Sequence, residues 1–306
     1  MTTTVLCGIA VLFSSILAGG VVTVSLVMIP ALRACAPNDE FHMHKAFNPL
    51  PDYYMPQSLF ISAFAAIAIL AVDDGLTDSS RTLSWVAVAL SVPVVMISLA
   101  LNRRINLVIR RWTADELPAG YAQLRADWDV AHILRTVLCV LIATCYTVAA
   151  LTDPSPTGAL WAASVLAAGM MAGGLVIVMA AVVPTFRRLP DRLAVRLHRE
   201  VDRYVDVPLP IFTILTFATA VGLLALGSAT ATRTALLAAA AGGALVVALS
   251  SHFVNRPMNQ RLNAWGDGPP PADYPALRRR WDAAHALRTV AGLTSLVCLI
   301  VAMLAR

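Results

Sequence analysis

The chain has 306 residues, of which 58% are hydrophobic and 13% are charged, and its formal net charge is +5. Soluble domains average about 45–50% apolar and about 25% charged residues, so this composition excludes a disordered chain and a disulfide scaffold and disfavours a soluble enzyme. We therefore expect long segments that lie in a lipid bilayer.

Eight segments are long and apolar enough to cross a bilayer core, which takes about 20 helical residues. Their charged residues lie near their ends, and continuous apolar runs lack the alternation of membrane β-strands, so we expect helices. The predicted fold class is an all-α integral membrane protein. In chain order the segments are approximately 5–31, 52–72, 82–102, 130–151, 158–184, 207–227, 234–254 and 283–305.

The charges predict an orientation. Nearly all basic residues fall in the loops after the first, third, fifth and seventh segments, whereas the opposite loops hold Asp73, Asp74, Asp78 and Asp153. The positive-inside rule then places the basic loops in the cytoplasm and both termini outside, in the plasma membrane. The same rule accounts for the pI of 9.2, so we expect no nucleic-acid partner.

The sequence also repeats. Residues 118–137 and 271–290 are identical at 13 of 20 positions, and further matches run along both halves at offsets of 153 and 154 residues. We predict a tandem duplication of two four-helix bundles, 1–152 and 153–306. Because each unit has an even number of spans, the units insert in the same orientation and are related by a pseudo-two-fold axis along the membrane normal.

The repeated polar residues converge at the predicted cytoplasmic ends of the helices. Trp128, His132 and Arg135 are spaced i, i+4 and i+7, so they share one face of the fourth helix. An arginine that enters an apolar span is a functional hypothesis by default. The predicted cluster of each unit consists of His44, Asn102, Asn106, Trp128, His132 and Arg135, and of His198, Asn255, Asn259, Trp281, His285 and Arg288.

Each of these residues has a structural alternative. The arginines can snorkel to anionic head groups, the tryptophans can belong to an interfacial belt, and the asparagines can link helices. Asp129, three residues before His132, either fixes the tautomer of that ring or complements the helix N-terminus, and Asp282 stands at the matching position. His42 and His252 have no counterpart in the other unit and are left out of the predicted site.

A metal site is a further alternative. His44 and His132, together with Asp52 or a tyrosine, could in principle hold iron or copper. The sequence has no His-x-x-x-His pair and no Glu-x-x-His pair on one helix, and the predicted bundle interior lacks the carboxylates of a di-iron centre.

Asn-x-x-x-Asn at the end of the third helix, followed by Trp-Asp-x-x-His-x-x-Arg-Thr in the fourth, resembles the anthrone oxygenase-like family of four-helix membrane proteins. The motif stands as LNRRIN with WDVAHILRT, and again as VNRPMN with WDAAHALRT. The resemblance covers both halves and implies a tandem fusion of two such domains.

The resemblance implies an oxygenase that converts an anthrone methylene to a carbonyl with O₂. His132 and His285, with His44 and His198 beside them, would be the candidate bases. The arginines and asparagines would stabilise the enolate or phenolate, and no cofactor would be required. The substrate would be a hydrophobic aromatic or quinone-like molecule.

The alternative function is that of a non-enzymatic membrane protein that binds a lipid or an anionic ligand, or of an accessory or transport subunit.

Overall fold

Long apolar helices make up most of the protein. The computed structural model describes residues 2–49, 51–112, 117, 119–151, 155–227, 230–265 and 272–305, and these ranges form helices and no strands. The prediction of an all-α integral membrane protein with eight spans is confirmed. The helical segments with the length and hydropathy of membrane spans are Thr2–Arg33, Pro51–Val72, Asp78–Arg111, Tyr121–Ala149, Pro156–Arg188, Pro208–Ala225, Ala231–Ala264 and Tyr274–Leu304.

Both halves contain the same succession of elements. The first half has α1 (Thr2–Thr23), η1 (Val24–Met28), α2 (Ile29–Arg33), α3 (Pro37–Phe47), α4 (Pro51–Val72), α5 (Asp78–Ile97), η2 (Ser98–Asn102), α6 (Arg103–Arg111) and α7 (Tyr121–Ala149). The second half has α8 (Pro156–Ile177), η3 (Val178–Val182), α9 (Val183–Arg188), α10 (Asp191–Val205), α11 (Pro208–Ala225), α12 (Ala231–Ser250), η4 (Ser251–Asn255), α13 (Arg256–Ala264) and α14 (Tyr274–Leu304). This order agrees with a duplication, although the predicted boundary at 152–153 lies outside the described residues, and the pseudo-two-fold axis stays a prediction.

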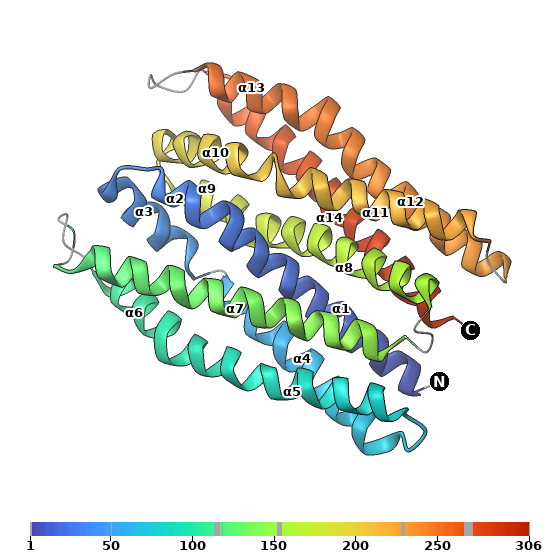
Figure 1. The fold of residues 1–306 in the computed structure, drawn as a ribbon. Helices are drawn as coiled ribbons and strands as arrows, with labels where there is room; N and C mark the ends of the chain where they lie inside the picture. The colour runs from blue at the N-terminus through green and yellow to red at the C-terminus, as the bar shows by residue number, and fades with distance from the viewer. Residues whose placement is uncertain are drawn as a thin grey trace.

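The helices form two bundles that meet along α1 and α8. In the first bundle α1 packs against α4 and α7, and α5 packs against α7. In the second, α8 packs against α11 and α14, and α12 against both of these. Figure 1 shows α1 and α8 in the middle of the molecule, with both chain termini at one end and the short helices α3 and α10 at the other.

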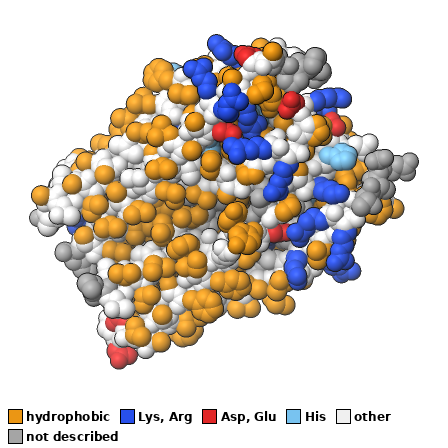
Figure 2. All heavy atoms as spheres, turned by 180° about the vertical axis from the view of Figure 1, so that it is seen from behind, with side chains coloured by type: hydrophobic (Ala, Val, Ile, Leu, Met, Phe, Trp, Pro, Cys, Tyr) orange, Lys and Arg blue, Asp and Glu red, His pale blue; other side chains and the backbone are white. Residues whose placement is uncertain are grey.

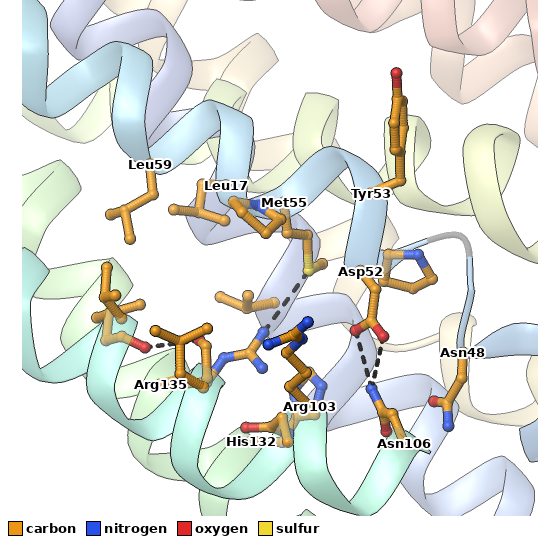
Figure 3. Close-up of a pocket in the computed structure, with 18 of the residues that line it drawn as sticks. Leu17, Asn48, Asp52, Tyr53, Met55, Leu59, Arg103, Asn106, His132 and Arg135 are labelled. Carbon is orange, nitrogen blue, oxygen red and sulfur yellow. Dashed lines mark hydrogen bonds between the residues drawn. The ribbon is translucent and has the colours of Figure 1, made fainter. Parts of the chain in front are cut away.

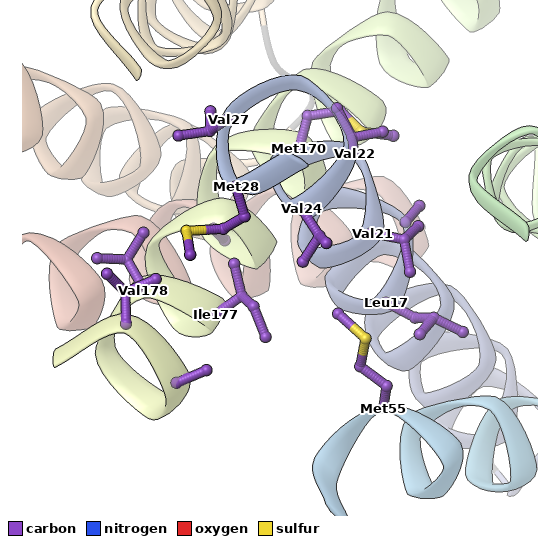
Figure 4. Packing of buried hydrophobic residues seen from close by; sticks show 14 of the residues in the cluster. Leu17, Val21, Val22, Val24, Val27, Met28, Met55, Met170, Ile177 and Val178 are labelled. Atoms are coloured by element: carbon purple, nitrogen blue, oxygen red, sulfur yellow. The ribbon is translucent and has the colours of Figure 1, made fainter. Parts of the chain in front are cut away.

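Small residues allow α1 and α8 to approach closely. A Cβ atom added to Gly173 of α8 would lie 2.8 Å from the Cα of Gly19 in α1, closer than real Cβ atoms pack. Around this contact, Figure 4 shows Val24 and Met28 next to Ile177 and Val178. Backbone proximity of this kind is how membrane helices gain packing energy when lipid is as apolar as their side chains.

Each half carries two π-helical segments, in its first and third spans. Pro30 and Pro184 follow η1 and η3 by two residues, and a proline without an N–H leaves a carbonyl of the preceding turn without its helical partner. The segments η2 and η4 end at Asn102 and Asn255, two residues of the predicted clusters. A π-helical turn rotates the residues that follow it, and such turns are frequent at functional sites.

The surface separates an apolar middle from one charged end. Exposed side chains such as Phe64 and Phe253 cover the spans, as expected of a surface that faces lipid. Figure 2 shows most Lys and Arg side chains gathered at one end, which we call the basic end. It carries the exposed residues Arg33, Arg104 and Arg187, among others.

Replacing Gly173 by valine should destabilise the protein, because the added side chain forces α1 and α8 apart. We expect a loss of about 1–3 kcal/mol, seen as a lower midpoint of thermal unfolding in detergent. Gly242 in α12 has open space around it, so Gly242→Val is the matched control and should leave the midpoint nearly unchanged. Equal midpoints for the two variants would contradict the close α1–α8 contact.

Candidate functional site

A cavity lies at the basic end of each bundle. The first cavity has a volume of about 400 Å³ and the second about 720 Å³. Eleven of the twelve predicted residues line them; His44 is instead packed against Trp128, with 4.5 Å between the ring centroids. The first cavity is lined by Asn102, Asn106, Trp128, His132 and Arg135, and the second by His198, Asn255, Asn259, Trp281, His285 and Arg288.

Asp129 anchors the fourth helix of the first unit to its neighbours. Its carboxylate pairs with Arg33 and, at 2.5 Å, with Arg125, which also pairs with Glu40. The interpretation that Asp129 orients His132 is therefore wrong, because arginines occupy its oxygens. The helix-terminus alternative is also wrong, since α7 begins at Tyr121, two turns earlier.

The second unit repeats this anchor. Asp282 pairs with Arg187 at 2.6 Å and with Arg278 at 3.2 Å. Four arginines are thus bound to two aspartates, and the fourth helix of each unit is fixed to the end of its first helix. The arginines one to two turns further into the bundles remain outside these ion pairs.

Arg135 and Arg288 are those two remaining arginines. They are 9% and 6% exposed and line the cavities, which contradicts the alternative that they snorkel to head groups. Arg135 points toward the sulfur of Met55 at 4.0 Å, as Figure 3 shows, and its Nε has no partner. Among the described residues, neither guanidinium has a carboxylate within ion-pair distance.

Arg288 is held by neutral groups. It donates to the hydroxyl of Ser251 at 3.1 Å and to Nδ1 of His285 at 2.6 Å. With the amide of Asn255 oriented to satisfy its neighbours, its oxygen accepts from Arg288 at 2.9 Å and from the indole N–H of Trp281 at 3.2 Å. Within the described ranges, the cation in the second cavity therefore has hydrogen-bond partners that are neutral and no carboxylate at ion-pair distance.

Each cavity tryptophan packs against two histidine rings. The ring of Trp128 is 4.5 Å from those of His44 and His132, and Trp281 is 4.7 Å from His198 and 5.3 Å from His285. Trp128 and Trp281 are 1% and 6% exposed, so they are not interfacial belt residues.

Each second asparagine of the motif binds a carboxylate, a feature that the predicted cluster did not include. The amide nitrogen of Asn106 donates to both oxygens of Asp52, at 2.9 and 3.0 Å (Figure 3). In the second unit Asn259 donates to Asp202, and Asn263 donates to the other oxygen of Asp202 at 3.2 Å. Both carboxylates line the cavities.

The repeat in the sequence points to only one of these two carboxylates. Asp52 matches Asp206 at the offset of 154, yet the residue that binds the second asparagine in the second unit is Asp202, one helical turn earlier. A search restricted to repeated positions therefore misses it. His252, left out of the prediction for the same reason, also lines the second cavity.

Burial keeps His44 and His198 neutral. These residues lie in α3 and α10, outside the membrane spans. Burial, followed by the charge of Arg125, lowers the pKa of His44 well below its usual value, and burial lowers the pKa of His198 to about 3. Burial also raises the pKa of Asp202, to about 6, with a further contribution from Asp206. At neutral pH the two rings are weak bases and Asp202 is mostly ionised.

The histidines and carboxylates do not converge as a metal cage. Among the described residues no group of three or more His, Cys, Asp or Glu side chains is placed to hold a metal ion. His44 and His132, the pair considered for iron or copper, each pack against the ring of Trp128.

The fold and these cavities define a class: an integral membrane protein with a polar, cationic site at one end of each of two helical bundles. The sequence model of the anthrone oxygenase family matches residues 43–145 and 202–298, about two thirds of the chain, and the protein belongs to this family. The two matched segments are consistent with a tandem duplication. No match was found among curated proteins or among solved structures.

Replacing Asp129 by asparagine should destabilise the protein, because it removes the shared anion of Arg33 and the buried Arg125. We expect a loss of about 2–4 kcal/mol, less than for a fully unpaired charge because Glu40 still pairs with Arg125. The control is Asp127→Asn, an exposed position two residues earlier on α7, on the other side of the helix. Thermal unfolding in detergent measures both, and similar midpoints would show that Asp129 is not an anchor.

Proposed function

We propose that the protein is a membrane-embedded oxygenase of hydrophobic aromatic molecules, anthrones or quinone precursors, and that each cavity is an active site. Membership of the anthrone oxygenase family supports oxygen chemistry. The observation that carries the proposal is the pair of buried guanidiniums, Arg135 and Arg288, for which the described residues supply no carboxylate at ion-pair distance. A buried charge without a protein partner is costly, and a substrate oxyanion would neutralise it.

The proposed reaction begins with loss of a proton from the acidic methylene of the substrate. The electron pair of the broken C–H bond delocalises onto the neighbouring carbonyl oxygen, where the arginine stabilises the developing charge. The electron-rich carbon then forms a C–O bond with O₂, and loss of water from the resulting hydroperoxide leaves a carbonyl. In sum, a CH₂ group and O₂ give C=O and H₂O.

The cavity walls are consistent with substrate entry from the bilayer. The first cavity includes Phe60 of α4 and Leu99 of η2, which are 46% and 55% exposed on the surface that faces lipid. The second includes Ile214 of α11, which is 64% exposed. Apolar, exposed lining residues favour a lateral opening through which an aromatic molecule dissolved in lipid reaches the polar end of the bundle.

We further propose that the basic end faces the cytoplasm in the plasma membrane. The concentration of Arg at this end and the acidic residues at the other support this orientation by the positive-inside rule. The active sites would then lie close to the cytoplasmic interface.

A second candidate function is the binding of an anionic lipid or another anionic ligand without turnover. Arg135, to which the described residues supply no carboxylate at ion-pair distance, favours it, because a phosphate or carboxylate head group would neutralise the same charge. A purified protein that retains a phospholipid in both cavities and never oxidises an anthrone would support this function and contradict the oxygenase.

Replacing both cavity arginines by glutamine should abolish most oxidation, because loss of an oxyanion partner costs about 10²–10³-fold in rate. The measurement is oxidation of anthrone by purified protein under ¹⁸O₂, with label followed into the product by mass spectrometry. Arg188→Gln, an exposed arginine of the basic end outside both cavities, is the matched control. If the Arg135→Gln, Arg288→Gln double variant keeps the wild-type rate, the arginines do not stabilise a substrate oxyanion.

A further inference from the structure

Both cavities hold a carboxylate in a fixed orientation. Asp52 receives two hydrogen bonds from Asn106, and Asp202 receives one each from Asn259 and Asn263. The amides fix the orientation of each carboxylate without neutralising its charge. Arg110 also contacts Asp52 at 3.4 Å, at the mouth of the first cavity, whereas no arginine lies within ion-pair distance of Asp202 among the described residues.

The two carboxylates come from different positions of the repeat. At the offset of 154, Asp52 matches Asp206 and Asp202 matches Asn48; at the offset of 153, Arg110 matches Asn263. The position of the acid therefore differs by four residues between the units, while its contact with the second asparagine of the motif is kept. Packing alone does not explain why both units place an acid at this point of an apolar bundle.

In each unit a different donor orients the asparagine amide. The oxygen of Asn106 accepts from the indole N–H of Trp128 at 3.0 Å, whereas the oxygen of Asn259 lies 3.2 Å from Nε2 of His198. Both contacts turn the NH₂ group of the amide toward the carboxylate. In the second unit this requires a proton on Nε2 of His198, so this ring positions the amide and does not receive a proton through that nitrogen.

The ring nitrogens of His285 are also occupied. Nε2 donates to the carbonyl of Leu175 at 3.1 Å, and the neutral ring then accepts from Arg288 at Nδ1. Nδ1 of His198 is buried without a partner, and both nitrogens of His44 are buried and outside the first cavity. In the second cavity this leaves the carboxylate of Asp202 as the oriented acceptor beside the arginine.

Resting on the proposed function, we infer that the carboxylate bound by the second asparagine, Asp202 in the second unit and Asp52 in the first, is the proton acceptor of the reaction. The substrate C–H bond breaks, its proton forms an O–H bond with the carboxylate, and its electron pair remains on the substrate as an enolate held by Arg288 or Arg135. Asn259 and Asn106 are positioning residues, and so is His198.

The acid–base properties of the groups outside the spans agree with this assignment. A base works best when its pKa lies near the working pH. The pKa of Asp202 is raised to about 6 by burial and by Asp206, whereas that of His198 is lowered to about 3 by burial and by Arg278.

Proton exchange without oxygen isolates this step. Anthrone in D₂O under anaerobic conditions takes up deuterium at its methylene when a base removes and returns a proton, and no oxidation occurs. The full-length protein is placed in nanodiscs, and mass spectrometry measures the deuterium uptake of anthrone. The rate without protein is subtracted. We expect Asp52→Asn with Asp202→Asn to lower the protein-dependent exchange about 100-fold or more, within the range for general base catalysis.

Further variants make the test specific. Asp202→Glu in the Asp52→Asn background restores a carboxylate and should recover part of the exchange, which a purely structural role would not produce. Asp127→Asn, exposed on α7, is the control. Exchange that persists in the double asparagine variant overturns the inference. Two other variants test alternative bases: Asp206→Asn, and His132→Gln combined with His285→Gln. The inference is also overturned if either of these abolishes exchange while the double asparagine variant still exchanges.

The same assay separates this inference from the proposed function. If the wild-type protein neither exchanges nor oxidises anthrone, the oxygenase proposal fails. If the wild type oxidises anthrone and the double asparagine variant exchanges at the wild-type rate, the oxygenase stands and only the carboxylate assignment fails.

The second cavity alone should show a defined pH dependence. In the Asp52→Asn background, exchange should rise with pH through about 6, because the carboxylate of Asp202 accepts a proton only when ionised. The charged and titratable groups that face it are Asp206, which raises its pKa, and Arg288, which lowers it, together with the neutral His198. A profile that is flat between pH 5 and 8, about the range in which an acid of this pKa changes charge, would contradict Asp202 as the acceptor.

Discussion

A charge inside a helical membrane bundle must find a partner, and this requirement organises the basic end of the protein. Asp129 and Asp282 each take two arginines, one from the end of the first helix of the unit and one from a turn earlier on their own helix. These ion pairs fix the helices around each cavity. In the part of the chain that the structure describes, Arg135 and Arg288 take part in none of these ion pairs, and their hydrogen bonds go to neutral groups. Each polar site therefore combines a layer of ion-paired arginines around Asp129 or Asp282 with a cavity arginine that takes no part in those ion pairs.

The two halves fulfil the same polar requirements with different residues. In the first unit the second asparagine is oriented by a tryptophan and binds an acid at the start of α4. In the second unit it is oriented by a histidine and binds an acid of α10. The cavities also differ in volume, about 400 Å³ against about 720 Å³. A duplicated chain can let one site diverge in this way while the other keeps its geometry.

Much of the fold was predictable because lipid imposes simple rules. Length and hydropathy identify the eight spans, and the i, i+4, i+7 spacing places Trp128, His132 and Arg135 on one face of α7. Two features were not predictable. The fourth helix of each unit begins earlier than hydropathy indicates, at Tyr121 in α7 and at Tyr274 in α14. Asp129 therefore lies within α7 and is buried among arginines. The acids of the cavities depend on how α10 and the start of α4 cross the third helix, which spacing along one chain does not specify.

The most direct measurement of the central claim is an experimental structure of the protein with anthrone bound in the absence of oxygen. We expect the ligand in the cavity at the basic end of a bundle, with its oxygen at hydrogen-bond distance from the guanidinium of Arg135 or Arg288. We also expect its methylene carbon to face the carboxylate of Asp52 or Asp202. A ligand found only outside the cavities, or an arginine neutralised by a phospholipid that anthrone does not displace, would contradict the central claim.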